Sequence, residues 1–136
     1  MKSLTVPARL DSLEVIANFL TAETATAGLD PQAGYKLRLA ADEIATNIIV
    51  HGYAGAAQPG TIDIRVDSDE RGVTVIVEDS AAPFDPRLVP PPDDLHLPPT
   101  QRRLGGLGIY LAMRSVDRFE YERVGDRNRN VLAMDR

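Results

Sequence analysis

The stretch TIDIRVDSDERGVTVIVED, residues 61–79, decides the fold because apolar and polar residues alternate on both sides of a short polar break. Successive side chains of a strand point to opposite faces. One face of the two predicted strands therefore carries six β-branched residues, Ile62, Ile64, Val66, Val73, Val75 and Val77. The break at Glu70–Gly72 supplies a turn, so the stretch predicts a β-hairpin with one apolar face.

Two helices are predicted before this hairpin. The first begins at Asp11 or Ser12, either of which can cap it, and ends near Gly28. The second has Pro31 in its first turn and stops at Gly52. Apolar residues recur at helical spacing in both, at Leu13, Ile16, Ala17 and Leu20 and then at Leu37, Ala41, Ile44 and Ile48. A short strand, SLTVPA at residues 3–8, precedes them.

The chain after the hairpin begins with a loop and ends with two strands. Residues 83–99 hold seven of the ten prolines, which excludes regular structure there. The segment GGLGIYLAMRSVD (105–117) predicts a helix, and FEYERV (119–124) and NVLAMD (130–135) predict strands around the turn GDRN. We therefore expect an α+β fold, a two-layer sandwich with a mixed sheet and its helices on one face. The whole chain, 1–136, is expected to form one domain.

Composition narrows the classes of function. The chain has 136 residues, is 43% hydrophobic and 26% charged, and carries a formal net charge of -5, which argues against a general nucleic-acid surface. It has no cysteine, which excludes disulfides and thiolate chemistry, and its two histidines, His51 and His96, do not by themselves suggest a zinc site. The first residues lack a signal-peptide core and no run is apolar enough to span a bilayer, so we expect a cytoplasmic protein.

Glu43 and Asn47 are four residues apart on the second predicted helix and therefore share a face. A carboxylate beside an amide oxygen can deprotonate a hydroxyl while the amide coordinates Mg²⁺. The alternative is an ordinary solvated polar face. His51 is expected to interact with the end of the same helix rather than to act as a ligand.

Asp79 ends the second hairpin strand and shares the face of Val73, Val75 and Val77. A carboxylate on an apolar face needs a partner, because burying it unpaired is costly. The exocyclic amine of a purine can serve as that partner. Alternatively, Asp79 caps the turn that follows the strand.

Three glycines, Gly105, Gly106 and Gly108, lie just before the third predicted helix. Glycine lets the backbone approach a ligand, and a helix N-terminus attracts phosphate. The spacing fits neither a dinucleotide fingerprint nor a Walker A loop, and a purely structural turn is the alternative. Arg102 and Arg103 lie close enough in sequence to reach a phosphate, or are simply solvated.

The order of these segments resembles one known superfamily. The segments DEIATNIIVHGY (42–53), VIVEDSAAPFDP (75–86), RRLGGLGIYLAMRSVD (102–117) and NVLAM (130–134) are similar to those of the GHKL ATPases and kinases, and most similar to bacterial anti-sigma-factor serine/threonine-protein kinases. The resemblance covers nearly the whole chain. It implies the Bergerat fold, found in histidine-kinase-like ATPases.

The resemblance also implies a role for each motif. Glu43 is the expected general base, Asn47 the Mg²⁺ ligand and Asp79 the partner of the adenine amine, while the segment from about residue 86 to 104 is a flexible ATP lid. The residues expected to bind nucleotide are Asn47, Asp79, Ala81, Phe84, Arg103, Gly105, Gly106, Leu107 and Gly108.

The implied activity is transfer of the ATP γ-phosphate to a serine or threonine of an anti-sigma antagonist with a STAS fold. A sigma factor is the implied second partner, and a homodimer is the expected assembly. No direct contact with nucleic acid or membrane is expected.

Two positions depart from the family pattern. The family usually has Asp-x-Gly at the second motif, and here Ala81 stands in the place of that glycine. The last strand usually carries a threonine near the nucleotide, and Ala133 is expected in its place. Together they favour an alternative function, a non-catalytic adaptor that binds protein partners with little or no nucleotide. The retained Glu43 and Asn47 favour an active kinase. The catalytic domain of a sensor histidine kinase is a third alternative, but the chain has no room for the separate helical hairpin that would carry a phospho-accepting histidine. A detached regulatory module of the kind linked to phosphatases in this family is a fourth.

Overall fold

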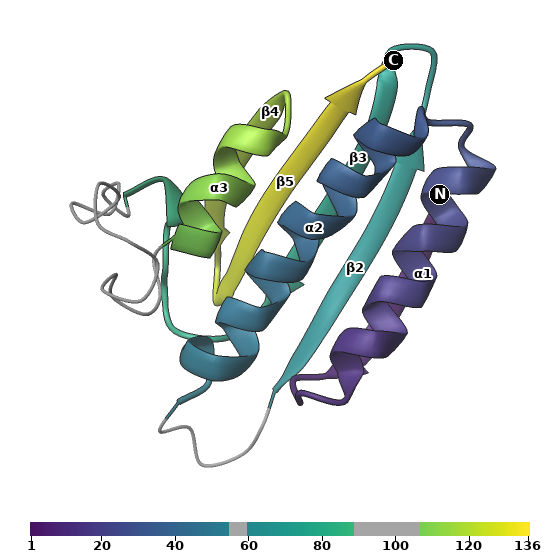
Figure 1. The fold of residues 1–136 in the computed structure, drawn as a ribbon. Coiled ribbons are helices and arrows are strands. Elements are labelled where there is room, and N and C mark those ends of the chain that lie inside the picture. The colour runs from purple at the N-terminus through teal and green to yellow at the C-terminus, as the bar shows by residue number, and fades with distance from the viewer. Residues whose placement is uncertain (55–59, 89–106) are drawn as a thin grey trace, which may run out of the picture.

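A five-stranded sheet forms one layer of the molecule, as the computed structural model in Figure 1 shows. The structure describes residues 1–54, 60–88 and 107–136. The strands lie in the order β1-β2-β3-β5-β4. Their bounds are β1 (Lys2–Pro7), β2 (Thr61–Ser68), β3 (Gly72–Asp79), β4 (Arg118–Val124) and β5 (Arg127–Asp135).

All neighbouring strands are antiparallel, so the expected mixed sheet is wrong in this respect. The reason lies in the path of the chain after β3. The chain crosses over through α3 (Leu107–Ser115) to β4, which runs parallel to β3. The tight turn at Gly125, whose φ is +61°, then returns β5 into the space between them. The two parallel strands therefore never become neighbours.

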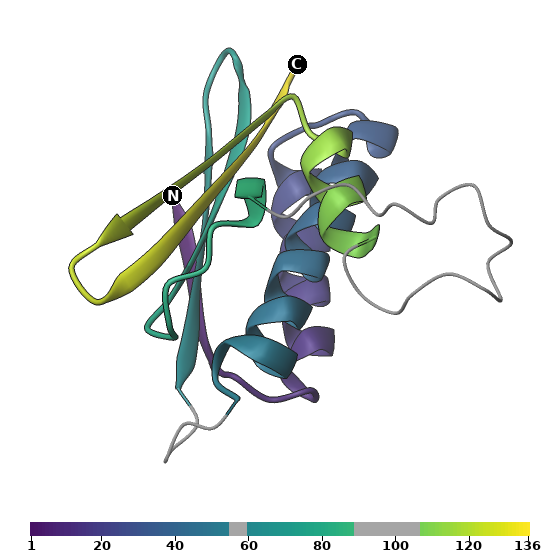
Figure 2. The ribbon, with the colours of Figure 1, turned by 90° about the vertical axis from the view of Figure 1, so that its left-hand side faces the viewer.

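The helices α1 (Ser12–Thr26), α2 (Pro31–Asn47) and α3 cover one face of the sheet, which confirms the expected two-layer architecture (Figure 2). The carboxylate of Asp30 caps α2 by accepting the backbone N–H groups of its first turn. Asp11 precedes α1 but does not cap it, because its carboxylate pairs with Arg9 at 2.6 Å instead.

The second helix does not end at Asn47. It continues through a π-helical turn, Ile48–Gly52, before the chain leaves the helical layer. Wider turns of this kind are rare and are frequently found at functional sites. Here the turn carries the chain to Tyr53, next to the end of β3.

The core lies between the helices and the inner face of the sheet. The hairpin residues predicted to share an apolar face are all buried there, at exposures of 4% or less. They pack against the stripes of α1 and α2, formed by Ile16, Leu20, Leu37, Ala41 and Ile44. Alternation in β2 and β3 was therefore sufficient to predict the buried face.

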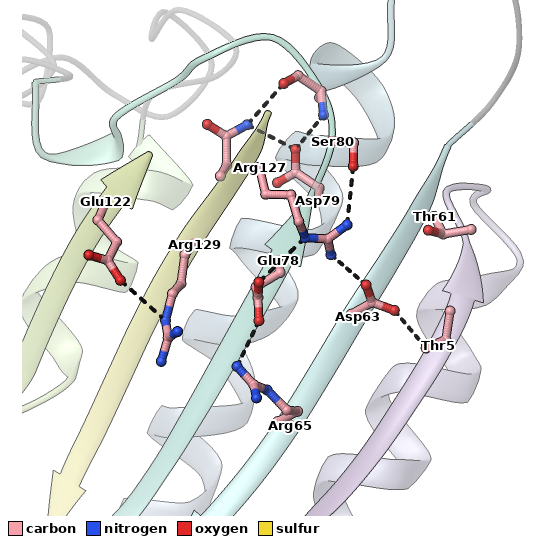
Figure 3. Close-up of polar contacts among 12 residues, drawn as sticks. Thr5, Thr61, Asp63, Arg65, Glu78, Asp79, Ser80, Glu122, Arg127 and Arg129 are labelled. Atoms are coloured by element: carbon pink, nitrogen blue, oxygen red, sulfur yellow. Dashed lines mark hydrogen bonds and ion pairs between the residues drawn. The ribbon is translucent and has the colours of Figure 1, made fainter. Parts of the chain in front are cut away.

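The outer face of the sheet carries ion pairs instead of helices (Figure 3). Arg127 of β5 bonds to Asp63 of β2 at 2.5 Å, and its Nε lies 3.4 Å from Glu78 of β3. Glu78 also accepts a hydrogen bond from the guanidinium of Arg65 at 2.8 Å. These half-exposed charges satisfy one another across three strands. Of the helices described, none is long and apolar enough to cross a membrane.

Candidate functional site

Asp79 is the most buried charged residue in the described part of the chain, at 1% exposure. It ends β3 on the inner face, as the alternation predicted. Its Oδ1 accepts the backbone N–H of Ala81 at 2.8 Å and the side-chain amide of Asn128 at 2.9 Å. Asp79 thus caps the following turn, and it also faces a cavity, so the two interpretations of this residue are compatible.

The cavity lies between the C-terminal end of α2, the end of β3 and the start of β5. It is small, with a volume of about 20 Å³, and it opens to the solvent at its mouth. Its lining comes from Ile44, Asn47, Ile48, Gly52, Asp79, Ala81, Ala82, Phe84, Pro86, Asn128 and Asn130. Polar groups converge in an otherwise apolar hollow, which is the usual composition of a ligand site. Phe84, 41% exposed, lies at its rim.

Asn128 ties the segment after Asp79 to β5. Its amide nitrogen donates to Asp79 and to the carbonyl of Ala82, at 2.9 and 3.0 Å. Its oxygen accepts the N–H of Phe84 at 3.3 Å and also the hydroxyl of Tyr121. Every hydrogen-bonding group of this side chain is used, so Asn128 holds the cavity wall in place.

Asn130, two residues further along β5, has an unpaired oxygen. The side chain is 3% exposed and lines the same cavity, yet its Oδ1 has no hydrogen-bond partner. Leaving a buried acceptor unpaired costs about 1–3 kcal/mol. A ligand that brings an N–H or O–H donor would remove that cost.

Sequence reasoning placed Asn128 in the turn, whereas β5 begins at Arg127, and it included Asn130 in the last strand without noting that it points inward. A usable signal existed, since Asn128 and Asn130 alternate in step with the buried Leu132 and Met134. Polar residues at inward positions of a strand are unusual and mark a site.

The two departures from the family pattern have local explanations. A methyl group on Gly52 would lie 3.2 Å from the Cβ of Ala81, so the methyl of Ala81 occupies space that glycine leaves open in the π-helical turn. Ala133 pairs with Thr74, far along β3 from Asp79, and belongs to the outer face. Its expected place beside the nucleotide is therefore wrong: the β5 residues in the cavity are Asn128 and Asn130.

Glu43 and Asn47 share one face of α2 as predicted, and α3 packs against that face. Asn47 lines both the Asp79 cavity and a second hollow that contains Glu43, His51 and Gly108. A methyl group on Gly108 would lie 2.0 Å from Oε2 of Glu43, so the carboxylate lies directly against the glycine backbone. Burial, and then the negative charge of Asp42, raises the pKa of Glu43 above its ordinary value. A carboxylate with a raised pKa is a better proton acceptor.

Tyr53 connects the loop after α2 to the end of β3. Its hydroxyl donates to the carbonyl of Thr61 at 2.9 Å and accepts the N–H of Ser80 at 2.8 Å. Gly60 allows this approach, because a methyl group there would lie 2.3 Å from the ring. Tyr53 thereby fixes the residue that follows Asp79.

Part of the predicted site lies outside the described residues. Arg103, Gly105, Gly106 and most of the predicted lid belong to residues 89–106. Leu107 begins α3, and Pro86–Leu88 form a short 3-10 turn. The predicted contacts of Arg103, Gly105, Gly106, Leu107 and the lid with nucleotide stay predictions.

Comparison with known proteins identifies the fold independently. The histidine kinase-like ATPase domain family matches residues 6–136. No curated protein matches the chain in sequence.

Two solved structures share the architecture. The RsbU and RsbW domains of Rv1364c from Mycobacterium tuberculosis superpose with a TM-score of 0.62 at 16% identity, over 100% of this chain and 33% of that one. The histidine kinase domain of the blue-light activated histidine kinase from Erythrobacter litoralis EL346 gives 0.55 at 15% identity, over 95% of this chain and 65% of that one. The chain thus spans about a third and just under two thirds of these two structures, and at such identities the likeness shows the fold.

Proposed function

Because the chain belongs to the histidine kinase-like ATPase domain family, we propose that it binds Mg-ATP and transfers the γ-phosphoryl group to a serine or threonine of a protein. One observation carries the proposal. Asn47 lies in both hollows, with the buried Asp79 in the first and Glu43, held against Gly108, in the second. A single elongated ligand can therefore donate an amine hydrogen bond to Asp79 at one end and place a reacting group beside Glu43, a proton acceptor, at the other.

The adenine would occupy the cavity of Asp79, whose walls must move apart to admit the ring, because the space between them is about 20 Å³. The carboxylate offers acceptor oxygen to the exocyclic amine, and the free Oδ1 of Asn130 offers a second acceptor in the same cavity. Apolar walls from Ile44, Ile48 and Phe84 suit the faces of a purine ring.

Mg²⁺ suits the second hollow through Asn47. The amide oxygen is a hard ligand of the kind Mg²⁺ prefers, and this ion usually takes only one or two protein ligands and completes its shell with phosphate and water. Among the described residues no group of three or more acidic or histidine side chains is placed to hold a metal ion. Bound there, the ion would neutralise the charge that develops on the phosphates.

Glu43 would act as the general base. The hydroxyl oxygen of the protein substrate attacks the γ-phosphorus, the bond from this phosphorus to the bridging oxygen breaks, and ADP leaves. The hydroxyl proton passes to the carboxylate of Glu43, which Gly108 keeps in place by leaving no side chain in its way.

The likeness to a structure that contains an RsbW domain supports an anti-sigma role. In that role the phosphorylated protein is a STAS-type antagonist, the second partner is a sigma factor, and the protein regulates transcription by partner switching, as a homodimer. The adaptor alternative rested on Ala81 and Ala133. It loses much of its support, because the methyl of Ala81 packs beside Gly52 and Ala133 lies on the outer face of the sheet.

The test is phosphoryl transfer from γ-labelled Mg-ATP to STAS-type proteins encoded in the same genome, followed by mass spectrometry of the modified residue. We expect one phosphoserine or phosphothreonine with the native chain and a loss of at least about 10²-fold in rate with Glu43→Gln. Stable binding of a STAS-type protein without any transfer would support the adaptor instead.

A further inference from the structure

A groove runs between α2 and α3, on the other side of Glu43 from the nucleotide hollows. Figure 1 shows the two helices side by side. The groove encloses about 350 Å³ and is lined by Leu39 and Glu43 from α2 and by Gly108, Leu111, Ala112 and Arg114 from α3. Most of its wall is apolar, and Glu43 and Gly108 also line the second hollow, which is proposed above for Mg²⁺.

Large apolar side chains are exposed along this groove. Leu39 is 44% exposed and Leu111 is 52% exposed. Tyr35, one turn before Leu39 on α2, is 57% exposed and extends the apolar surface beyond the groove. Apolar side chains that are exposed together along one groove, unlike ones scattered singly, can mark a site of contact with a partner.

The charges of the groove differ at its two ends. The carboxylate of Glu43 closes the end beside Gly108. Arg114, whose guanidinium lies 5.3 Å from the ring centre of Tyr110, lies six residues further along α3. The leucines lie between these ends. An occupant that matches this pattern carries a neutral proton donor at the first end, an aliphatic side chain in the middle and an acidic group at the second end.

The distances between the groove residues along the helix axes predict how far apart the matching residues lie in a bound peptide. Leu39 lies four residues from Glu43, about 6 Å along the axis of α2, and Arg114 lies six residues from Gly108, about 9 Å along the axis of α3. An extended chain advances about 3.3 Å per residue. The aliphatic residue then falls about two positions from the hydroxyl, and the acidic residue about three.

We propose that the groove binds the substrate polypeptide. An extended segment presents a serine or threonine to Glu43, an aliphatic side chain to Leu39 and Leu111, and an aspartate or glutamate to Arg114. This proposal rests on the proposed function, because the hydroxyl at Glu43 is the phosphoryl acceptor. It adds the sequence that the acceptor must lie in and the surface that recognises it.

The experiment selects peptides by binding rather than by reaction. A displayed library of random peptides around a fixed serine is panned against the full chain, and the enriched sequences are read. We expect enrichment of aliphatic residues about two positions from the serine and of acidic residues about three positions away. Leu39→Asp and Leu111→Asp should each reduce this enrichment at least about tenfold, the cost of about 1.4 kcal/mol of lost binding.

Two further variants keep the result independent of folding. Val124→Asp replaces an aliphatic residue that is 53% exposed at the end of β4, away from the groove, and should leave the selection unchanged. Arg114→Glu should replace the acidic preference by a basic one. Absence of a consensus, or the same consensus with Leu111→Asp, would overturn the proposal.

Two outcomes separate the groove from the chemistry. Selected peptides that bind but accept no phosphate from Mg-ATP would support the groove and contradict the kinase function. Transfer to a protein substrate at the native rate by Leu39→Asp and Leu111→Asp would support the kinase and overturn the groove. A dimer that Leu111→Asp dissociates in sedimentation would also overturn it, by making a second copy of the chain the occupant.

Discussion

Replacing Gly108 by alanine should lower the rate of phosphoryl transfer about 10²-fold without loss of stability. The new methyl group would lie 2.0 Å from Oε2 of Glu43, whereas real contacts of this kind are essentially never closer than 3.0 Å. The carboxylate must therefore retreat by about 1 Å, and a misplacement of this size can cost about 10²-fold in rate. This movement should cost little free energy of unfolding, because the obstructing atom, Oε2 of Glu43, lies at the end of a flexible side chain. Alanine also favours a helix over glycine by up to about 1 kcal/mol.

Gly72→Ala is the matched control. Its methyl group would lie 2.1 Å from the backbone oxygen of Met134, so the overlap is almost the same. The obstructing atom now belongs to β5, and strand backbone cannot rotate away. We expect a loss of about 1–3 kcal/mol in the free energy of unfolding.

Urea unfolding and initial rates of phosphoryl transfer at saturating Mg-ATP distinguish the two variants. Gly108→Ala should unfold at or above the native midpoint and turn over about 10²-fold more slowly, while Gly72→Ala should unfold at lower urea. The reasoning is refuted if Gly108→Ala is as unstable as Gly72→Ala, or if it keeps the native rate.

Three further variants test other parts of the site. Burial and the charge of Asp42 raise the pKa of Glu43, so the folded protein binds this proton more tightly than the unfolded chain does. The free energy of unfolding should therefore fall as the pH rises from 4.5 through the raised pKa. Glu43→Gln should raise the melting temperature at pH 8, and a gain that did not shrink toward pH 4.5 would contradict this assignment. Asn130→Leu removes the unpaired acceptor, so calorimetry should find a higher melting temperature without ligand. Mg-ATP should then raise the melting temperature of this variant by less than that of the native chain. A lower melting temperature without ligand would count against an unpaired oxygen. Tyr53→Phe removes the bonds to Thr61 and Ser80 and should lower the free energy of unfolding by about 1 kcal/mol in urea, whereas no change would mean that water replaces them.

Local patterns predicted most of the elements. Alternation in residues 61–79 gave both hairpin strands and the buried face, and Gly28, with φ of +72°, follows α1 where a stop was expected. The spacing of Glu43 and Asn47 placed them on one face of α2, which the helix period determines.

Features that depend on distant pairing were not predictable in this way. The antiparallel sheet follows from the insertion of β5 between β3 and β4, and local alternation does not encode that order. The register Asp79↔Asn128 puts Asn128 at the site and moves Ala133 away from it, and this register is a contact between residues 49 positions apart. Asp11 satisfied the cap pattern, but Arg9 competed for its carboxylate.

The central claim is that this cavity binds ATP through Asp79, and a melting curve with and without millimolar Mg-ATP tests it most directly. Asp79→Asn is the informative variant, because its amide oxygen can still accept the N–H groups of Ala81 and Asn128. A ligand at a hundred times its dissociation constant stabilises a protein by about 2.7 kcal/mol, which corresponds to an increase of several degrees. The account predicts that increase for the native chain and its loss in Asp79→Asn. No increase in a well-folded native chain, or the same increase in both proteins, would contradict it.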